Sequence, residues 1–164
     1  MDKSSLGFKG FVKLAASIIL CQLAGVVGSI FTISSIPTWY AGLRKPFFSP
    51  PNWVFGPVWI TLYLMMGISL YLIWKRGLAE KAVRDGVLTF AVQLILNSVW
   101  SIAFFGLKSP IAGLTVIILL WLAIALTIQK FWRISKTASV LLIPYLLWVS
   151  FATILNASIL ILNP

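Results

Sequence analysis

The side chains that could do chemistry in this sequence are aromatic rings, amides and hydroxyls set inside long apolar stretches. Gln93, Asn97 and Ser101 recur at every fourth residue, so they share one face of a helix, and Trp100 lies beside them. Polar side chains inside a membrane turn toward the interior of a helix bundle, where they find partners. The pattern predicts a pocket with aromatic walls for an apolar ligand. The alternative is an interhelical hydrogen-bond network with aromatic filler.

A second set of such residues lies near the C-terminus. Trp148, Ala152 and Asn156 occupy successive turns of one helical face. Four of the apolar stretches contain a tryptophan, at Trp59, Trp100, Trp121 and Trp148. A packing network explains the amides well but the repeated tryptophans less well, and this favours the pocket.

Several kinds of catalytic and metal site are excluded by what the sequence lacks. It has no histidine, and its three acidic residues, Asp2, Glu80 and Asp85, lie outside the apolar stretches. Paired-carboxylate catalysis, a serine–histidine triad and the usual zinc sites are therefore not expected. Ion-coupled transport is disfavoured, because such transporters carry ionisable groups within the membrane.

The elements that must position these residues are five uncharged stretches, each about 20 residues long and so able to cross a bilayer as a helix. Hydrophobic residues make up 60% of the chain and charged residues 10%, whereas a soluble domain carries about 25% charged residues. We therefore predict an all-α membrane protein, with residues 1–164 forming one domain and one bundle of five transmembrane helices. The predicted spans are 14–33, 56–74, 86–107, 110–129 and 138–162. Pro144 should bend the last of them near residues 140–144.

Basic residues are distributed unequally among the connecting segments. The N-terminus and the second and fourth connections share one side of a five-span protein, and they carry ten of the thirteen Lys and Arg residues. The other side carries Arg44, Lys45 and Lys108. This bias predicts a cytoplasmic N-terminus and an external C-terminus in a plasma-membrane-type bilayer. Because the bases flank apolar stretches, the lipid bilayer is the expected partner and nucleic acid is not.

The connection over residues 34–55 is unusually long and rich in aromatic residues. It holds four prolines, six aromatic residues and two bases. Prolines oppose a regular helix, and connections longer than about 12–15 residues are often lids or binding loops. We predict an ordered, irregular cap over the outer end of the bundle, with Trp39, Pro46 and Trp53 as candidate ligand contacts. The alternative is a segment lying flat on the lipid headgroups.

Three parts of the chain resemble the motifs of a known family. The first runs from Trp39-Tyr40 through Lys45-Pro46 and Pro50-Pro51 to Trp53-Val54-Phe55-Gly56-Pro57-Val58-Trp59; the others are Gln93-Leu94-x-Leu96-Asn97-x-x-Trp100-Ser101 and Pro144-Tyr145-x-x-Trp148-x-x-Phe151-Ala152-x-x-Leu155-Asn156. In this order they resemble the translocator protein family, also called tryptophan-rich sensory protein or peripheral benzodiazepine receptor.

The resemblance implies a homodimer that binds porphyrins, and in some members sterols, in a cavity under the first loop. It places Asn97, Trp100, Ala152, Leu155 and Asn156 at pocket-lining positions. It matches Trp59 and Trp148 to tryptophans linked to light- and oxygen-dependent breakdown of protoporphyrin. The short Leu/Val–Tyr–Lys/Arg pattern proposed for cholesterol is absent from this sequence, so sterol binding through it is not expected.

The sequence and the resemblance together indicate an integral membrane receptor or sensor. The expected ligand is a porphyrin such as protoporphyrin IX, or a similar hydrophobic molecule, with no covalently bound cofactor. Transport of the ligand stays open. The alternative is a light- and oxygen-dependent protoporphyrin-degrading enzyme in which Trp59 and Trp148 are catalytic.

Overall fold

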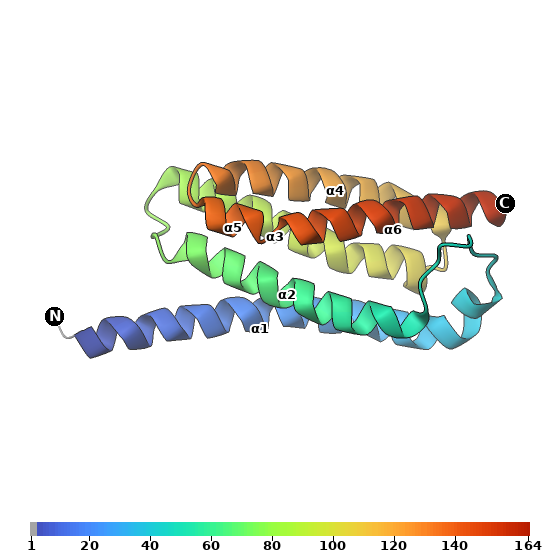
Figure 1. Cartoon of the computed structure of the whole chain (residues 1–164), viewed down its shortest axis with the longest axis horizontal. Helices are drawn as coiled ribbons and strands as arrows, with labels where there is room; N and C mark the ends of the chain where they lie inside the picture. Colours follow the sequence, from blue (N-terminus) through green and yellow to red (C-terminus); the bar gives the residue numbers. More distant parts are fainter. Residues whose placement is uncertain (1–2) are drawn as a thin grey trace.

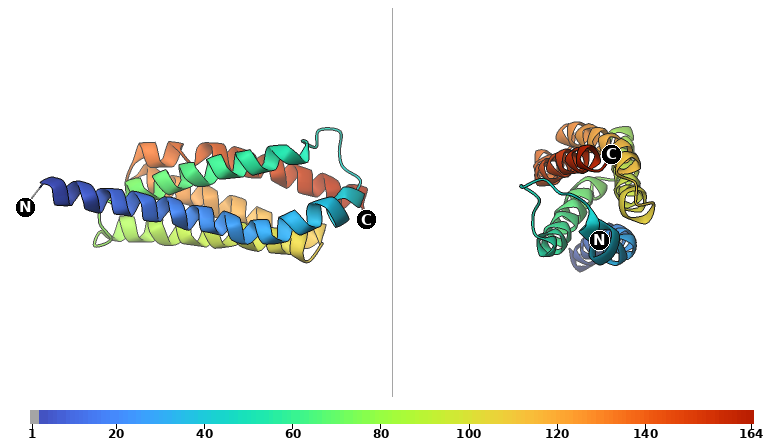
Figure 2. Two further views of the ribbon diagram at one scale, coloured as in Figure 1. Left: turned by 90° about the horizontal axis from the view of Figure 1, so that it is seen from below. Right: turned by 90° about the vertical axis from the view of Figure 1, so that its right-hand side faces the viewer.

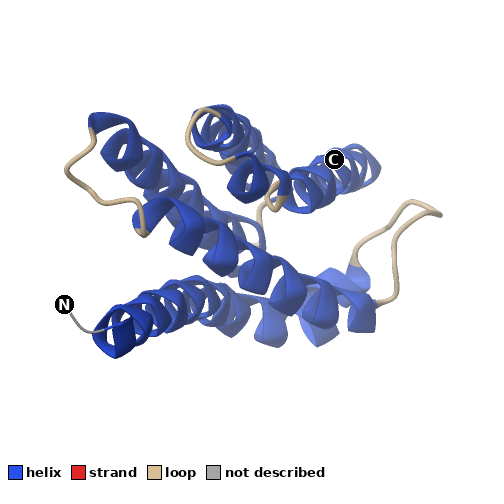
Figure 3. Cartoon of the chain, turned by 60° about the vertical axis from the view of Figure 1, so that its left-hand side comes forward, coloured by secondary structure: helices blue, strands red, loops and turns tan. Residues whose placement is uncertain are grey.

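A computed structural model describes residues 3–164, and all of its regular elements in this range are helices (Figures 1 and 3). Five helical segments are long and apolar enough to cross a membrane: Gly10–Tyr40, Asn52–Trp74, Lys81–Gly106, Pro110–Trp132 and Lys136–Leu162. The prediction of an all-α protein with five membrane-spanning helices is confirmed. Each span extends beyond its predicted limits at one or both ends, because charged and aromatic residues at the membrane surface continue the helices. Asp2 lies outside the described residues.

The helices form an antiparallel bundle with the two chain ends at opposite ends (Figure 1). Helix α1 (Lys3–Ser35) packs on α2 (Asn52–Trp74) and on α3 (Lys81–Ser101). Helix α4 (Pro110–Trp132) packs on α3 and on the final pair, α5 (Lys136–Val140) and α6 (Ile143–Leu162). Large apolar side chains remain exposed along the outer faces of all five spans, as expected where lipid is the solvent.

The first connection is shorter than predicted. Helix α1 continues through a π-helical turn, η1 (Ile36–Tyr40), and remains helical to Gly42, while α2 begins at Asn52 directly after Pro51. Only residues 43–51 are irregular, so the predicted irregular segment 34–55 was wrong at both ends. The reason is that Pro37 lies at the start of the π turn, and such local changes of helical register let a membrane helix pass a proline.

The predicted bend in the last span is confirmed. Helix α5 ends at Val140, residues 141–142 form a turn, and α6 begins at Ile143 with Pro144 in its first turn. A proline in the first helical turn costs no hydrogen bond, because the N–H group there has no partner inside the helix. Ser69 of α2 donates to the carbonyl oxygen of Ala138 over 2.7 Å, which holds the short helix against the bundle.

Helices α1 and α2 pack backbone against backbone in the half of the bundle nearer the N-terminus. A Cβ atom built at Gly67 would lie 2.6 Å from the Cα atom of Ile18. On α1, Ser17 and Cys21 are buried against this crossing, and Gly25 abuts the ring of Tyr63. Small residues allow such close approach of membrane helices. The α1–α2 crossing therefore depends on glycine and other small side chains.

Candidate ligand-binding site

A cavity of about 530 Å³ lies in the half of the bundle nearer the C-terminus, which we call the outer half. Its walls come from α1 with η1, from the first half of α2, from the end of α3 with the π turn η2 (Ile102–Gly106), and from α6. The cavity falls within the usual range of ligand pockets, about 300–1,000 Å³. Among the residues that the structure describes, no acidic or basic side chain lines it.

Aromatic rings form one continuous wall of the cavity. The ring of Trp59 stacks on that of Tyr63 at a centroid distance of 5.4 Å and lies 6.4 Å from that of Trp100. Trp100 in turn stacks on Phe104 at 5.8 Å. The wall therefore joins α2 to the end of α3 and presents rings on which a flat apolar molecule could stack.

The indole of Trp100 is held in place by an amide from α6. Its Nε1 donates to Oδ1 of Asn156 over 3.4 Å, and Nδ2 of Asn156 donates to the carbonyl oxygen of Pro110 over 2.8 Å. Both side chains are buried. This pair of hydrogen bonds fixes Trp100 against the start of α4, so the aromatic wall is formed before any ligand binds.

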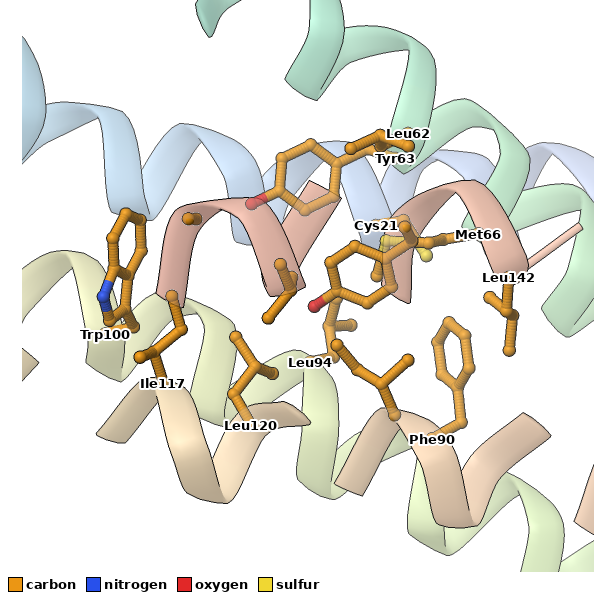
Figure 4. Close-up of a cluster of buried hydrophobic side chains, with 14 of the residues drawn as sticks. Cys21, Leu62, Tyr63, Met66, Phe90, Leu94, Trp100, Ile117, Leu120 and Leu142 are labelled. Carbon is orange, nitrogen blue, oxygen red and sulfur yellow. The ribbon is translucent and has the colours of Figure 1, made fainter. Parts of the chain in front are cut away.

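A buried hydrogen-bond network closes the cavity on its inner side. The hydroxyl of Tyr63 donates to Oδ1 of Asn97, whose Nδ2 donates to the hydroxyl of Tyr145 over 3.1 Å. The three side chains join α2, α3 and α6. The packed side chains labelled near Tyr63 in Figure 4, among them Met66 and Leu94, fill the adjoining part of the core. The cavity therefore ends near the middle of the bundle.

The structure places six of the predicted ligand-binding residues on the cavity wall. They are Trp53, Trp59, Trp100, Ala152, Leu155 and Asn156. The other four lie outside it. Asn97 belongs to the network just described, Trp39 packs edge-on against Phe104 at 5.4 Å, and Pro46 lies in the irregular segment.

Trp148, the fourth predicted residue outside the wall, stands behind it. Its ring contacts that of Phe55 at 6.0 Å and that of Phe151 at 5.5 Å. Phe55 lines the cavity, so one aromatic ring separates Trp148 from the space within. Trp121, the remaining tryptophan noted in the spans, donates to the hydroxyl of Ser150 over 2.8 Å and joins α4 to α6.

Sequence reasoning missed the part that α1 plays in the cavity. Gln22, Gly28, Ser29 and Thr32 contribute to its wall. The available signal is the set of small residues at every fourth position of this helix, a pattern that is usually a sign of close helix packing. Small side chains also leave space where two helices diverge. Phe104 and Phe105 were missed because the π turn that directs them inward cannot be read from apolar periodicity.

The irregular segment 43–51 is attached to the end of α6. The backbone N–H of Arg44 donates to Oδ1 of Asn163 over 3.0 Å, and Nδ2 of Asn163 donates back to the carbonyl oxygen of Arg44 over 2.9 Å. The ring of Phe48 contacts that of Phe151 at 6.2 Å. The segment is thus held across the end of the bundle at which α6 ends, although none of its residues lines the cavity.

Comparisons with known proteins agree with this architecture. A model of the TspO/MBR family matches residues 17–162. The chain is 49% identical over 156 residues to the tryptophan-rich protein TspO of Chlorobaculum tepidum, covering 95% of this chain and 99% of that protein. It is 51% identical over 152 residues to the tryptophan-rich protein TspO of Archaeoglobus fulgidus, covering 93% and 97% of the two chains. It is also 45% identical over 137 residues to the human translocator protein, covering 82% of this chain and 80% of that one.

Proposed function

Because this chain belongs to the TspO/MBR family of integral, multi-pass membrane proteins, we propose that it is a receptor or sensor that holds a porphyrin in the cavity of its outer half. The cavity offers what a flat, largely apolar macrocycle needs, namely a space of about 530 Å³ and few polar groups. Such pockets take their affinity from apolar and aromatic walls and their orientation from a few placed polar atoms.

The observation that carries this proposal is the aromatic wall of Trp59, Tyr63, Trp100 and Phe104. Aromatic groups attract one another in offset or edge-on arrangements beyond the contribution of the buried area. The Asn156 hydrogen bond holds Trp100 in position, so little side-chain entropy is lost when a ligand binds. A preformed wall of this kind favours a rigid, planar ligand.

We expect Trp59→Ala to weaken protoporphyrin binding about five-fold, since losing one aromatic contact costs about 1 kcal/mol. The matched control is Trp132→Ala, which removes a half-exposed indole at the other end of the bundle and should leave the affinity unchanged. The measurement is a titration of the purified protein with protoporphyrin in the dark, followed by absorbance. A parent protein that does not bind, or equal losses in both variants, would refute the proposed site.

The degrading enzyme remains the second candidate, and the position of Trp59 supports it. Its indole lines the cavity and lies within 6.4 Å, centroid to centroid, of Tyr63, Trp100 and Tyr145. A neighbouring set of oxidisable rings could stabilise a radical formed beside a light-excited porphyrin. Trp148, by contrast, lies behind Phe55, so its electron would have to travel farther.

Illuminating the samples from the same titration, in air and under argon, separates the two candidates. If the protein is a receptor, light should change the absorbance spectrum of bound porphyrin to the same extent in the parent and in Trp59→Phe. Phenylalanine keeps a stacking face, so the variant should still bind. A distinct product that forms only in air, and that Trp59→Phe fails to form while still binding, would establish the enzyme in place of the receptor.

We propose that the N-terminus faces the cytoplasm in a plasma-membrane-type bilayer, as the ten-to-three bias of bases indicates. A cysteine introduced at Phe47, which is fully exposed in the segment 43–51, should react with a membrane-impermeant thiol reagent in intact cells. A cysteine at Ala79, in the connection between α2 and α3, should react only after lysis. The native Cys21 is buried and gives no background. The reverse labelling pattern would invert the topology.

A further inference from the structure

We propose that the ligand reaches the cavity sideways from the hydrocarbon of the outer leaflet, through a portal between α1 and α2, and not from water past the segment 43–51. The inference rests on the proposed function, because it concerns the route to that same cavity. It also defines the ligand class, since a molecule that enters this way must first dissolve in the bilayer.

Four large apolar residues mark the portal. Val26 and Ile33 of α1, and Trp53 and Ile60 of α2, all line the cavity. Each is also well exposed at the surface, with exposed fractions of 55%, 70%, 74% and 62%. A side chain that contacts both the cavity and the outside stands at an opening. Because these residues lie within membrane-spanning segments, the opening faces lipid.

The course of the two helices explains the gap. Their backbones approach closely where Gly67 meets Ile18, and the helices separate toward the outer end of the bundle (Figure 2, left). A hydrogen bond of 3.1 Å from Nε2 of Gln22 to the carbonyl oxygen of Ile60 joins them at the inner edge of the cavity. Beyond this bond, among the described side chains, no hydrogen bond joins α1 to α2.

The rim of the portal is suited to hydrocarbon. Ser29 and Thr32 are its polar side chains on α1, and each donates its hydroxyl to a carbonyl of its own helix, over 2.7 and 3.0 Å. These groups therefore need no water. On the aqueous side, Asn163 and Phe48 attach the segment 43–51 to α6, so a ligand that entered past this segment would have to break these contacts.

The test introduces a larger side chain at the portal, at a position where the added atoms would not clash with the rest of the protein. A Cβ atom at Gly56 meets no atom within 4 Å, although Gly56 lines the cavity on the α2 side. Gly56→Leu should therefore fold and should slow both binding and release of protoporphyrin about tenfold, as one added steric barrier of about 1.4 kcal/mol would. The affinity should change less than either rate, because a gate affects the two rates alike. The control is Gly42→Leu, which also meets no atom within 4 Å but lies off the cavity.

A second arm closes the other route. In a Cys21→Ala background, cysteines at Arg44 and Asn163 are joined by a short bifunctional thiol reagent, so that the segment 43–51 cannot lift from α6. Binding and release should keep the rates of the untethered protein. Rates are measured by stopped-flow fluorescence with protoporphyrin added to nanodiscs.

Each outcome decides between the two routes. Slowing by the tether, or unchanged rates in Gly56→Leu, would overturn the portal while leaving the proposed function intact. A Gly56→Leu protein with lower affinity and an unchanged association rate would make Gly56 a wall residue and would also overturn it. A parent protein that does not bind protoporphyrin would remove the proposed function and this inference with it.

Discussion

Replacing Gly67 by alanine is expected to lower the free energy of unfolding by about 1–3 kcal/mol, the usual cost of overpacking a close-fitting contact. The added Cβ atom would lie 2.6 Å from the Cα atom of Ile18 and 3.0 Å from its backbone nitrogen. A backbone cannot rotate aside as the end of a side chain can, so α1 and α2 would have to move apart. The measurement is unfolding in mixed micelles with increasing SDS, followed by circular dichroism.

A glycine on the same helix supplies the control. Gly56→Ala places a Cβ atom where no atom lies within 4 Å, and alanine favours a helix over glycine by about 1 kcal/mol. This variant should therefore be as stable as the parent or slightly more stable. Equal losses in Gly67→Ala and Gly56→Ala would contradict the account, because helix propensity acts on both sites and only the crossing distinguishes them.

Asn97→Leu should also destabilise the protein strongly, by about 2 kcal/mol. The leucine fills much of the same space but leaves the hydroxyls of Tyr63 and Tyr145 without the amide that joins them. A buried polar group without a partner costs about 1–3 kcal/mol in general, while single hydrogen bonds between membrane helices average about 0.6 kcal/mol. The same unfolding assay measures the loss.

Two further variants separate a lost hydrogen-bond network from lost packing. Gln93 lies one turn away on α3 and is also buried, but in the described part of the chain neither atom of its amide has a hydrogen-bond partner. Gln93→Leu should therefore leave the stability unchanged or raise it. The triple variant Tyr63→Phe, Asn97→Leu, Tyr145→Phe should recover most of the loss, since removing all partners together is nearly neutral. If Gln93→Leu is as damaging as Asn97→Leu, the contrast between paired and unpaired amides fails.

The number of spans and the helical fold could be predicted because both follow from local composition. Twenty uncharged apolar residues have few alternatives in a bilayer, where each backbone N–H and C=O group must be paired within the helix. The bend at Pro144 was predictable for a similarly local reason, since a proline opposes the interior of a helix and is tolerated in its first turn. The same rule failed at Pro37, where a π turn carries the helix past the proline.

The types of residue in the candidate site could be predicted from the sequence. Which of these residues line the cavity could be predicted only in part. Trp59, Trp100 and Asn156 stand out in the sequence as aromatic and amide side chains within apolar stretches, and all three line the cavity. Asn97 and Trp148 carry the same signal but lie behind the wall, because which side of a helix meets empty space depends on how its neighbours are tilted. Periodicity identifies the inward face of a helix and does not say whether that face meets a void or another side chain.

The amino-acid sequence determines that this chain spans a bilayer five times and that Gln93, Asn97 and Asn156 face inward. Both follow from the free energy of transferring charged, polar and apolar groups between water and lipid. Only the tertiary structure decides where the cavity lies and where it opens. Helices α1 and α2 meet at Gly67 and Ile18 and then diverge, so small residues that appear suited only to packing come to line an empty space. That space arises from the angle between two helices, which depends on contacts between residues far apart in the chain.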